Sequence, residues 1–282
     1  MPPEPPVVSA RSLREALDLL AEQPYRPLAG GTDLMVQLTG EIGPPPDRVL
    51  DLWRLDELRG IDVRGGALEL GALTTYTDVR RSAACREHAP SLVDAAATIG
   101  AAQIQNRGTI GGNVMNASPA GDTLPVLLAL DAVLVLGGTS GEREVPATDF
   151  WPAYRRTAAR PDELLVRIRI PIVGDREQRF RKVGTRRAQA ISKVVVAVAW
   201  RGSDAWQDMR IALGSVAATS IRVREAEAAL EGQPRDPGSI EAAVEALGAA
   251  IRPIDDVRST AAYRREAARR VVRRLLSDAV TP

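Results

Sequence analysis

Hydrophobic positions recur along this chain with two different spacings, and these spacings predict the elements of the fold. The sequence SLRE at 12–15 is typical of a capping box and predicts a helix that ends near Ala21. The other elements expected here are a strand near 26–29, a helix after Thr32 and a strand at 48–52. Together these elements predict a small first lobe over about residues 1–52.

The middle of the chain predicts a second lobe over about residues 53–174. Its expected strands are 67–72, 132–136 and 164–170, and its expected helices are 77–85, 91–101 and 123–130. In the strand at 164–170, apolar residues alternate with Arg167 and Arg169. That alternation indicates a strand with one side facing either solvent or a partner.

A polar stretch at 174–178 predicts the boundary with a third part, residues 175–282. Strands are expected there at 193–200 and 209–216, and helices at 221–231, 240–250 and 261–276. Strands followed by helices are typical of a layered α+β arrangement, with helices on one face of an antiparallel sheet. We therefore expect an α+β protein that ends in a smaller α+β domain.

Two glycine-rich segments interrupt these patterns. The first is LAGGTDLMVQ at 28–37, and the second runs from Gly108 to Leu130 as GTIGGNVMNASPAGDTLPVLLAL. Glycine lets a backbone approach a ligand closely and point its N–H groups at an anion. Neither segment is a G-x-G-x-x-G fingerprint or a Walker loop. Two anion cradles about eighty residues apart predict one long diphosphate ligand held between two lobes.

These segments resemble the FAD-binding subunit of the molybdenum hydroxylases, the family of the carbon monoxide dehydrogenase medium subunit and the xanthine dehydrogenase flavin domain. The resemblance extends in order through DLW at 51–53, LRGI at 58–61, 164–171, 180–194 and YRR at 263–265. It implies a two-lobed FAD-binding domain of the PCMH/VAO type over 1–174. A C-terminal domain of the carbon monoxide dehydrogenase flavoprotein type would follow over 175–282.

Composition narrows the possible chemistry. The 282 residues carry a formal net charge of +1, which points to neither nucleic acid nor an anionic membrane as partner. One cysteine, Cys85, and one histidine, His88, exclude a disulfide, a cysteine-held iron–sulfur cluster and a multi-histidine metal site within this sequence. No apolar run is long enough to span a bilayer, and no basic-then-apolar signal region follows the proline-rich start, so we expect a cytoplasmic protein.

The first glycine segment supplies one group of expected cofactor contacts. These are Leu28, Ala29, Gly30, Gly31, Thr32, Asp33 and Leu34. The Asp33 carboxylate would be unfavourable beside a diphosphate unless it turned away, which favours a role in helix capping or at the surface. Leu34 and Met35 recur at helical spacing, which favours a place in the core.

The second segment supplies the other group. The resemblance implies that the amides and side chains of Thr109, Ile110, Gly111, Gly112 and Asn113 bind the diphosphate and ribityl oxygens. From the residues alone, this segment is also consistent with a tight turn between helices. Ser118 and Asp122 hydrogen-bond ribityl or adenosine hydroxyls in the resembled family. A helix-capping role for Asp122 is the alternative.

Two further residues are expected beside the flavin ring. By resemblance, Lys182 places a positive charge near the ring, where it would stabilise the reduced anionic flavin. Leu165 aligns with an aliphatic residue that packs on the ring, although a plain core position is equally consistent with the sequence. Arg186 and Arg187 are further basic candidates, with a solvated surface as the alternative for Arg187. Gln189 and Ala190 depart from the family pattern, because xanthine dehydrogenases carry acidic residues there.

No Ser-His-Asp triad and no prominent acid pair is present, so the redox chemistry is expected to belong to FAD. The resemblance implies partner subunits, a small one with [2Fe–2S] clusters and a large one with molybdopterin, and a doubled heterotrimer. Electrons would pass through FAD to an external acceptor such as NAD+, quinone or oxygen. The alternatives are a self-contained flavoenzyme with the same FAD-binding fold and a binding module that has lost FAD.

Overall fold

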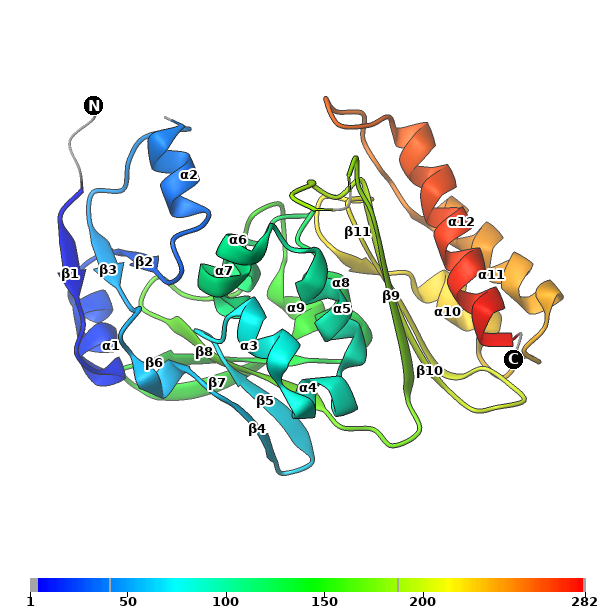
Figure 1. Cartoon of the computed structure of the whole chain (residues 1–282), viewed down its shortest axis with the longest axis horizontal. Helices are drawn as coiled ribbons and strands as arrows, with labels where there is room; N and C mark the ends of the chain where they lie inside the picture. The colour runs from blue at the N-terminus through cyan, green and yellow to red at the C-terminus, as the bar shows by residue number, and fades with distance from the viewer. Residues whose placement is uncertain (1–4, 41, 187, 281–282) are drawn as a thin grey trace.

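The computed structural model describes residues 5–40, 42–186 and 188–280, which form three parts in a row (Figure 1). The first part is a three-stranded parallel sheet in the order β1-β3-β2. Its elements are β1 (Val7–Ser9), α1 (Leu13–Glu22), β2 (Arg26–Leu28), α2 (Leu34–Thr39) and β3 (Val49–Asp51). Ser12 caps α1 through Glu15 N–H, as expected, but the Glu15 carboxylate accepts from Arg11 N–H at 2.7 Å. The expected capping box is therefore displaced by one residue.

The middle part is an antiparallel sheet of five strands in the order β4-β5-β8-β6-β7, with short helices above one face (Figure 1). Its strands are β4 (Ile61–Arg64), β5 (Ala67–Gly71), β6 (Val133–Gly138), β7 (Gly141–Pro146) and β8 (Leu164–Pro171). Its helices are η1 (Asp56–Leu58), α3 (Tyr76–Arg81), α4 (Ala83–His88), α5 (Pro90–Thr98), α6 (Ala102–Arg107), α7 (Ile110–Asn116), α8 (Leu124–Ala129) and α9 (Ala147–Phe150). The helix expected at 77–85 is thus two helices, separated at Ser82, which caps the second one.

The charged side of β8 is neutralised within the sheet. Arg167 donates to Glu142 on β7, and Arg169 pairs with Glu144 on β7 and with Glu69 on β5. Glu69 and Arg169 face each other on the neighbouring strands β5 and β8, whereas Glu142 and Glu144 reach the two arginines across β6. Whether this side faces solvent or a partner stays open, because the ion pairs are compatible with both.

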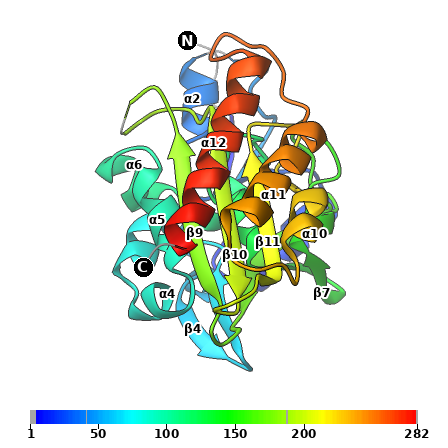
Figure 2. The same ribbon diagram turned by 90° about the vertical axis from the view of Figure 1, so that its right-hand side faces the viewer.

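The third part is an antiparallel sheet of four strands in the order β12-β11-β10-β9, with three helices on its outer face (Figure 2). The elements are β9 (Glu177–Val183), β10 (Val194–Arg201), β11 (Gln207–Gly214), β12 (Ile221–Arg222), α10 (Arg224–Leu230), α11 (Pro237–Ala250) and α12 (Ala261–Val280). This arrangement matches the expected α+β layer. The polar stretch expected to be a boundary lies between β8 and β9 and leads into β9, a strand that the apolar pattern does not predict.

Strand β10 joins the two larger parts because both of its faces are buried. Val196 and Val198 face the core formed with α10–α12, whereas Ala197 and Ala199 belong to the core of the middle part. Helix α8 packs on this second face, against β10 and β11. Alanine leaves room for a helix to lie close to the sheet, so the alternation of large and small residues fixes which layer lies on each side.

The second glycine segment is helical over most of its length. Residues expected to form a loop at 108–122 instead include α7, which Thr109 caps by accepting from Gly112 N–H at 3.0 Å. A threonine followed by an apolar residue signals such a cap, but the two glycines conceal it because glycine weakens a helix. Among the described residues, no helix is long and apolar enough to cross a membrane.

Candidate cofactor cleft

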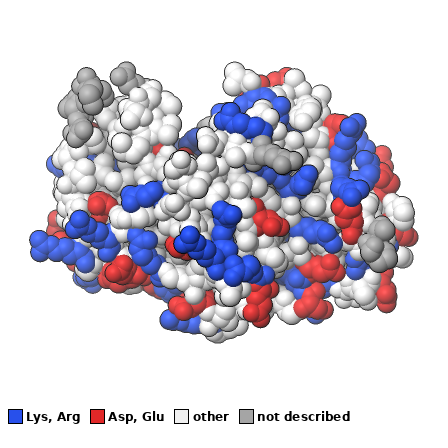
Figure 3. Space-filling view, in the orientation of Figure 1, with Lys and Arg blue, Asp and Glu red and all other residues white. Residues whose placement is uncertain are grey.

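A cleft of about 1110 Å³ opens where the three parts meet, and Figure 3 shows the notch between the N-terminal lobe and the C-terminal helices. The expected residues that line it are Leu28, Ala29, Gly30, Gly31, Thr32, Asp33, Leu34, Thr109, Gly111, Gly112, Asn113, Ser118, Asp122, Leu165 and Lys182. Ile110 does not line the cleft, because its side chain is fully buried in the core. Residues more than 150 positions apart thus share one cavity.

Two glycines are required where backbones touch beneath the cleft. A Cβ on Gly30 would lie 1.7 Å from the carbonyl oxygen of Arg107, which brings the two glycine segments into direct contact. A Cβ on Gly111 would lie 2.5 Å from the carbonyl oxygen of Ala72 at the end of β5. Neither distance is compatible with a side chain, so these two glycines are needed for packing.

Gly112 has a different environment. The only neighbour that its Cβ would meet within 4 Å, among the described residues, is the Thr109 hydroxyl at 3.0 Å. Gly112 also lines the cleft. A side chain there would project into the cavity, so the absence of one leaves space for a ligand beside α7.

The N–H groups of the two segments differ in availability. In the second segment, Ile110 donates to Thr74, Gly111 to Ala72, Gly112 to Thr109 and Asn113 to Thr109. These four N–H groups already have acceptors within the protein, and their contact with a diphosphate stays a prediction. In the first segment, the N–H groups of residues 29–34 make no hydrogen bond to another described residue. The anion-binding capacity of the cleft lies in this first segment.

Asp33 connects the two segments instead of capping α2. Its carboxylate accepts from the Asn116 side-chain amide at 2.9 Å, and no side-chain cap is formed at α2. Asn116 in turn accepts from Arg155 at 3.1 Å. The carboxylate is thereby held by the end of α7 at the edge of the cleft, and the expected capping role is not seen.

Asp122 and Lys182 form a buried ion pair at the cleft, with the Lys182 Nζ 2.5 Å from Asp122 Oδ2. Lys182 also donates to the Thr98 carbonyl at 3.2 Å, and Ser192 Oγ donates to Asp122 Oδ1. Burial raises the pKa of Asp122, whereas the Lys182 ammonium and the hydroxyls of Ser192 and Thr98 oppose that rise. Two residues that the sequence assigns separately to the cofactor thus contact each other.

The cleft also contains polar groups that sequence reasoning did not select. Tyr76 is buried beside Gly108, and its ring lines the cleft. Burial raises the pKa of this phenol strongly, so it remains a neutral donor. Glu163 lines the cleft as well, held by Arg143 on β7 at 2.6 Å. No short motif marks either residue in the sequence.

The C-terminal wall of the cleft is built around Arg264, which is 4% exposed. Its guanidinium donates to the Ser215 carbonyl at 2.9 Å and to Asp256 at 2.7 Å. The YRR motif at 263–265 carried part of the resemblance, and the structure gives its central arginine a role in holding two loops together.

The remaining basic candidates lie apart from these contacts. Arg186 folds back on its own turn and donates to the Ala188 carbonyl at 3.0 Å. Arg187 lies outside the described residues. Leu165 is 5% exposed and lines the cleft, so it is both a core residue and part of the wall.

The residues present fit a dinucleotide of the FAD type. Free N–H groups at 29–34 suit a diphosphate, and Gly112 leaves room beside it. Within the described part of the chain, no cluster of His, Cys, Asp and Glu could hold a metal ion.

Comparison with known proteins agrees with this chemistry. Residues 4–173 match the family described as FAD binding domain in molybdopterin dehydrogenase, and 179–279 match CO dehydrogenase flavoprotein C-terminal domain. The glyceraldehyde dehydrogenase medium chain of Sulfolobus acidocaldarius is 34% identical over 94% of each chain. The nicotinate dehydrogenase FAD-subunit of Eubacterium barkeri is 32% identical over 95% of this chain and 93% of its own length.

A solved structure of carbon monoxide dehydrogenase from Hydrogenophaga pseudoflava superposes with a TM-score of 0.94 at 31% identity, covering 99% of this chain and 98% of that chain. The expected fold class, the family resemblance and the FAD cofactor are thereby confirmed. The chain belongs to the family of FAD-binding subunits of the molybdopterin dehydrogenases, which are subunits of oxidoreductase complexes.

Proposed function

We propose that this chain carries electrons through an FAD held in the cleft between its three parts. The observation that supports the placement most directly is the pair of glycine segments in backbone contact, one with free N–H groups and one with Gly112 open to the cavity. The contacting residues would be those expected from the sequence except Ile110, which does not line the cleft and whose N–H donates to the Thr74 carbonyl. We place the domain boundary near residue 174, between β8 and β9.

Each group has a definite part in binding. The N–H groups at 29–34 donate to the diphosphate, and the hydroxyls of Thr32 and Ser118 supply further polar contacts. Lys182 has three N–H donors, of which Asp122 and Thr98 take two, so one is left to point at the cofactor. When bound, FAD supplies the acceptance and release of electrons, which the side chains of this protein do not provide.

The proposed partners are a small subunit with [2Fe–2S] clusters and a large subunit with molybdopterin. Relatives are named as medium chains or FAD subunits, and so as parts of larger enzymes. The sequence has one cysteine, which is fully buried and cannot ligate such clusters. An external acceptor, NAD+, quinone or oxygen, would then receive the electrons from the flavin.

The placement is tested with Gly112→Val, matched by Gly174→Val at an exposed glycine with nothing within 4 Å. The first variant should purify without flavin while keeping its circular dichroism spectrum, because the side chain occupies the cavity. The control should stay yellow. A fully yellow Gly112→Val protein would show that the cofactor lies elsewhere, and mass spectrometry of the heat-released cofactor should give FAD and no FMN.

A further inference from the structure

Alternate residues along β9, together with the residue just before it, contact the middle part of the protein; we call them the β9 rail: Arg176, Gln178, Phe180 and Lys182. Arg176 lies one residue before the strand begins. Gln178, Phe180 and Lys182 point to the same face, because side chains two apart on a strand do so. Their odd-numbered neighbours face α10–α12, where the Arg179 guanidinium lies 5.8 Å from the Trp200 ring. The rail therefore runs along the junction between the C-terminal sheet and the remainder of the molecule.

Every member of the rail has a partner in the middle part. Gln178 donates to the His88 carbonyl and accepts from the Ser91 hydroxyl, both at 2.8 Å. Phe180 packs against the core of the middle part. Lys182 ends the rail in the cleft, on Asp122. The position of the Lys182 ammonium in the cleft thus depends on how β9 packs against the middle part.

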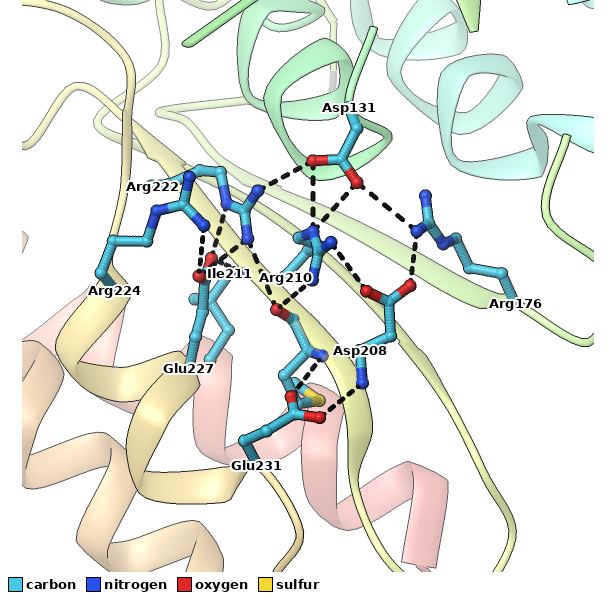
Figure 4. Close-up of polar contacts among 10 residues, drawn as sticks. Asp131, Arg176, Asp208, Arg210, Ile211, Arg222, Arg224, Glu227 and Glu231 are labelled. Atoms are coloured by element: carbon cyan, nitrogen blue, oxygen red, sulfur yellow. Dashed lines mark hydrogen bonds and ion pairs between the residues drawn. The ribbon is translucent and has the colours of Figure 1, made fainter. Parts of the chain in front are cut away.

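The other end of the rail is held by Asp131, on the turn between α8 and β6 (Figure 4). Its carboxylate pairs with three arginines of the C-terminal part, Arg222 at 2.8 Å, Arg210 at 3.0 Å and Arg176 at 3.4 Å. The side chains of Arg176 and Arg222 are each only 5% exposed. Ion pairs with such buried cations are sensitive to the loss of one partner, because a charge would remain unpaired.

Helix α8 connects the two ends. Asp122 lies just before it and Asp131 just after it, and all six of its residues are buried. A helix of six residues is about 9 Å long and has little freedom to bend. The same short helix therefore fixes both Asp122, which holds Lys182, and Asp131, which holds Arg176.

We propose that Asp131 is a positioning residue for the cofactor: by holding Arg176 at one end of β9, it sets the place of Lys182 at the other end, in the cleft. This inference rests on the proposed placement of FAD. Asp131 itself does not line the cleft, so its effect on the cofactor passes through β9.

Asp208 provides a matched control. It pairs with two of the three arginines that Asp131 contacts, Arg176 at 2.5 Å and Arg210 at 2.7 Å, and its φ of 51° equals that of Asp131. Asparagine tolerates this backbone conformation as aspartate does. Asp208 belongs to β11, however, so its pairs stay within the C-terminal part. Asp131→Asn removes the ion pairs across the junction, whereas Asp208→Asn removes an equal charge from Arg176 and Arg210 and leaves those pairs in place.

The experiment measures FAD binding to the full-length apoprotein by flavin fluorescence, with the melting temperature recorded in parallel. Asp131→Asn should raise the Kd roughly two- to thirtyfold. Asp208→Asn should leave the Kd unchanged, even where it lowers the melting temperature as much. In a Lys182→Met background, Asp131→Asn should have no further effect on the Kd, because its route to the cofactor has been removed.

Several outcomes would overturn the proposal. Equal effects of Asp131→Asn and Asp208→Asn on the Kd would mean that the ion pairs of Asp131 only stabilise the fold. No effect of either substitution on the Kd would mean the same. An undiminished effect of Asp131→Asn in the Lys182→Met background would exclude Lys182 as the intermediary. If Asp131→Asn does not fold, Gln178→Met cuts the rail at its middle, and an unchanged Kd in that variant overturns the proposal equally. Failure of the wild-type apoprotein to bind FAD would instead contradict the placement of the cofactor.

Discussion

Gly30 and Gly112 both line the cleft, but the absence of a side chain serves a different purpose at each. Gly30 is required because a neighbouring backbone occupies the space of a side chain, whereas Gly112 is open towards the cavity. The sequence presents both as parts of similar glycine-rich segments. Only their three-dimensional neighbours separate a packing role from a ligand-binding role.

Gly30→Ala should destabilise the protein by about 2–3 kcal/mol, since the added methyl group overlaps the Arg107 carbonyl and the two segments must separate. Its backbone φ is not in the left-handed region, so strain in that dihedral does not contribute. Urea denaturation should show the loss, with Gly174→Ala as an open-space control. Equal midpoints for both variants would contradict the tight contact.

Lys182→Met separates two roles of the ammonium. As a cofactor contact, its loss should weaken FAD binding about tenfold, the order expected for one hydrogen bond to a charged group. As the partner of Asp122, its loss leaves a buried carboxylate that must take up a proton or remain unpaired. Lys182→Met/Asp122→Asn removes that penalty and should recover stability in thermal melts without recovering affinity. Recovery of both would assign Lys182 to structure alone.

At the scale of elements, the apolar pattern predicts the buried strands and misses the charged one. Strand β10 has a continuous run of apolar residues, because both faces are covered, and the sequence predicts it. Strand β9 carries polar side chains on both faces, and these side chains are covered only by residues distant in the sequence. Likewise α7 begins with glycines, so its helical state depends on the Thr109 cap and on packing.

The turn before α12 gives a pH-dependent prediction. Desolvation would raise the pKa of Asp256, but hydrogen bonds from the backbone N–H groups of Arg258 and Ser259 and from Arg264 outweigh it and lower the pKa to about 2. A carboxyl whose folded pKa lies below its usual value of 3.8 stabilises the fold above that pH. This contribution is lost as the pH falls towards 2.

The difference in unfolding free energy between the wild type and Asp256→Asn should therefore be constant above about pH 5 and shrink between pH 4 and 2. Chemical denaturation at a series of pH values measures it. A difference that stays constant down to pH 2 would mean that the ionised carboxylate does not contribute to holding this turn.

For the whole molecule, the sequence predicts that the two glycine segments meet at a cleft, but not which other residues complete its walls. The order of elements and the two glycine segments are sufficient to predict a cleft between lobes. The C-terminal wall, with Ser215 and Arg264, is not predicted, because its residues come from loops whose approach depends on the packing of α8 against β10 and β11. The Asp122–Lys182 pair is missed for the same reason, since 60 positions separate its members.

At this scale the proposal of an electron-transfer subunit makes a direct prediction. The isolated yellow protein should not oxidise a small organic substrate, because the described acids that line the cleft are engaged by other side chains. Lys182 holds Asp122, Arg143 holds Glu163, Asn116 holds Asp33 and Arg264 holds Asp256. Co-expression with iron–sulfur and molybdopterin partners should restore substrate-dependent flavin reduction. The assay compares flavin bleaching in the isolated chain and in the complex under anaerobic conditions, with dithionite as the control that the flavin can be reduced. Stoichiometric bleaching of the isolated chain by an organic substrate would instead favour a self-contained flavoenzyme with the same fold.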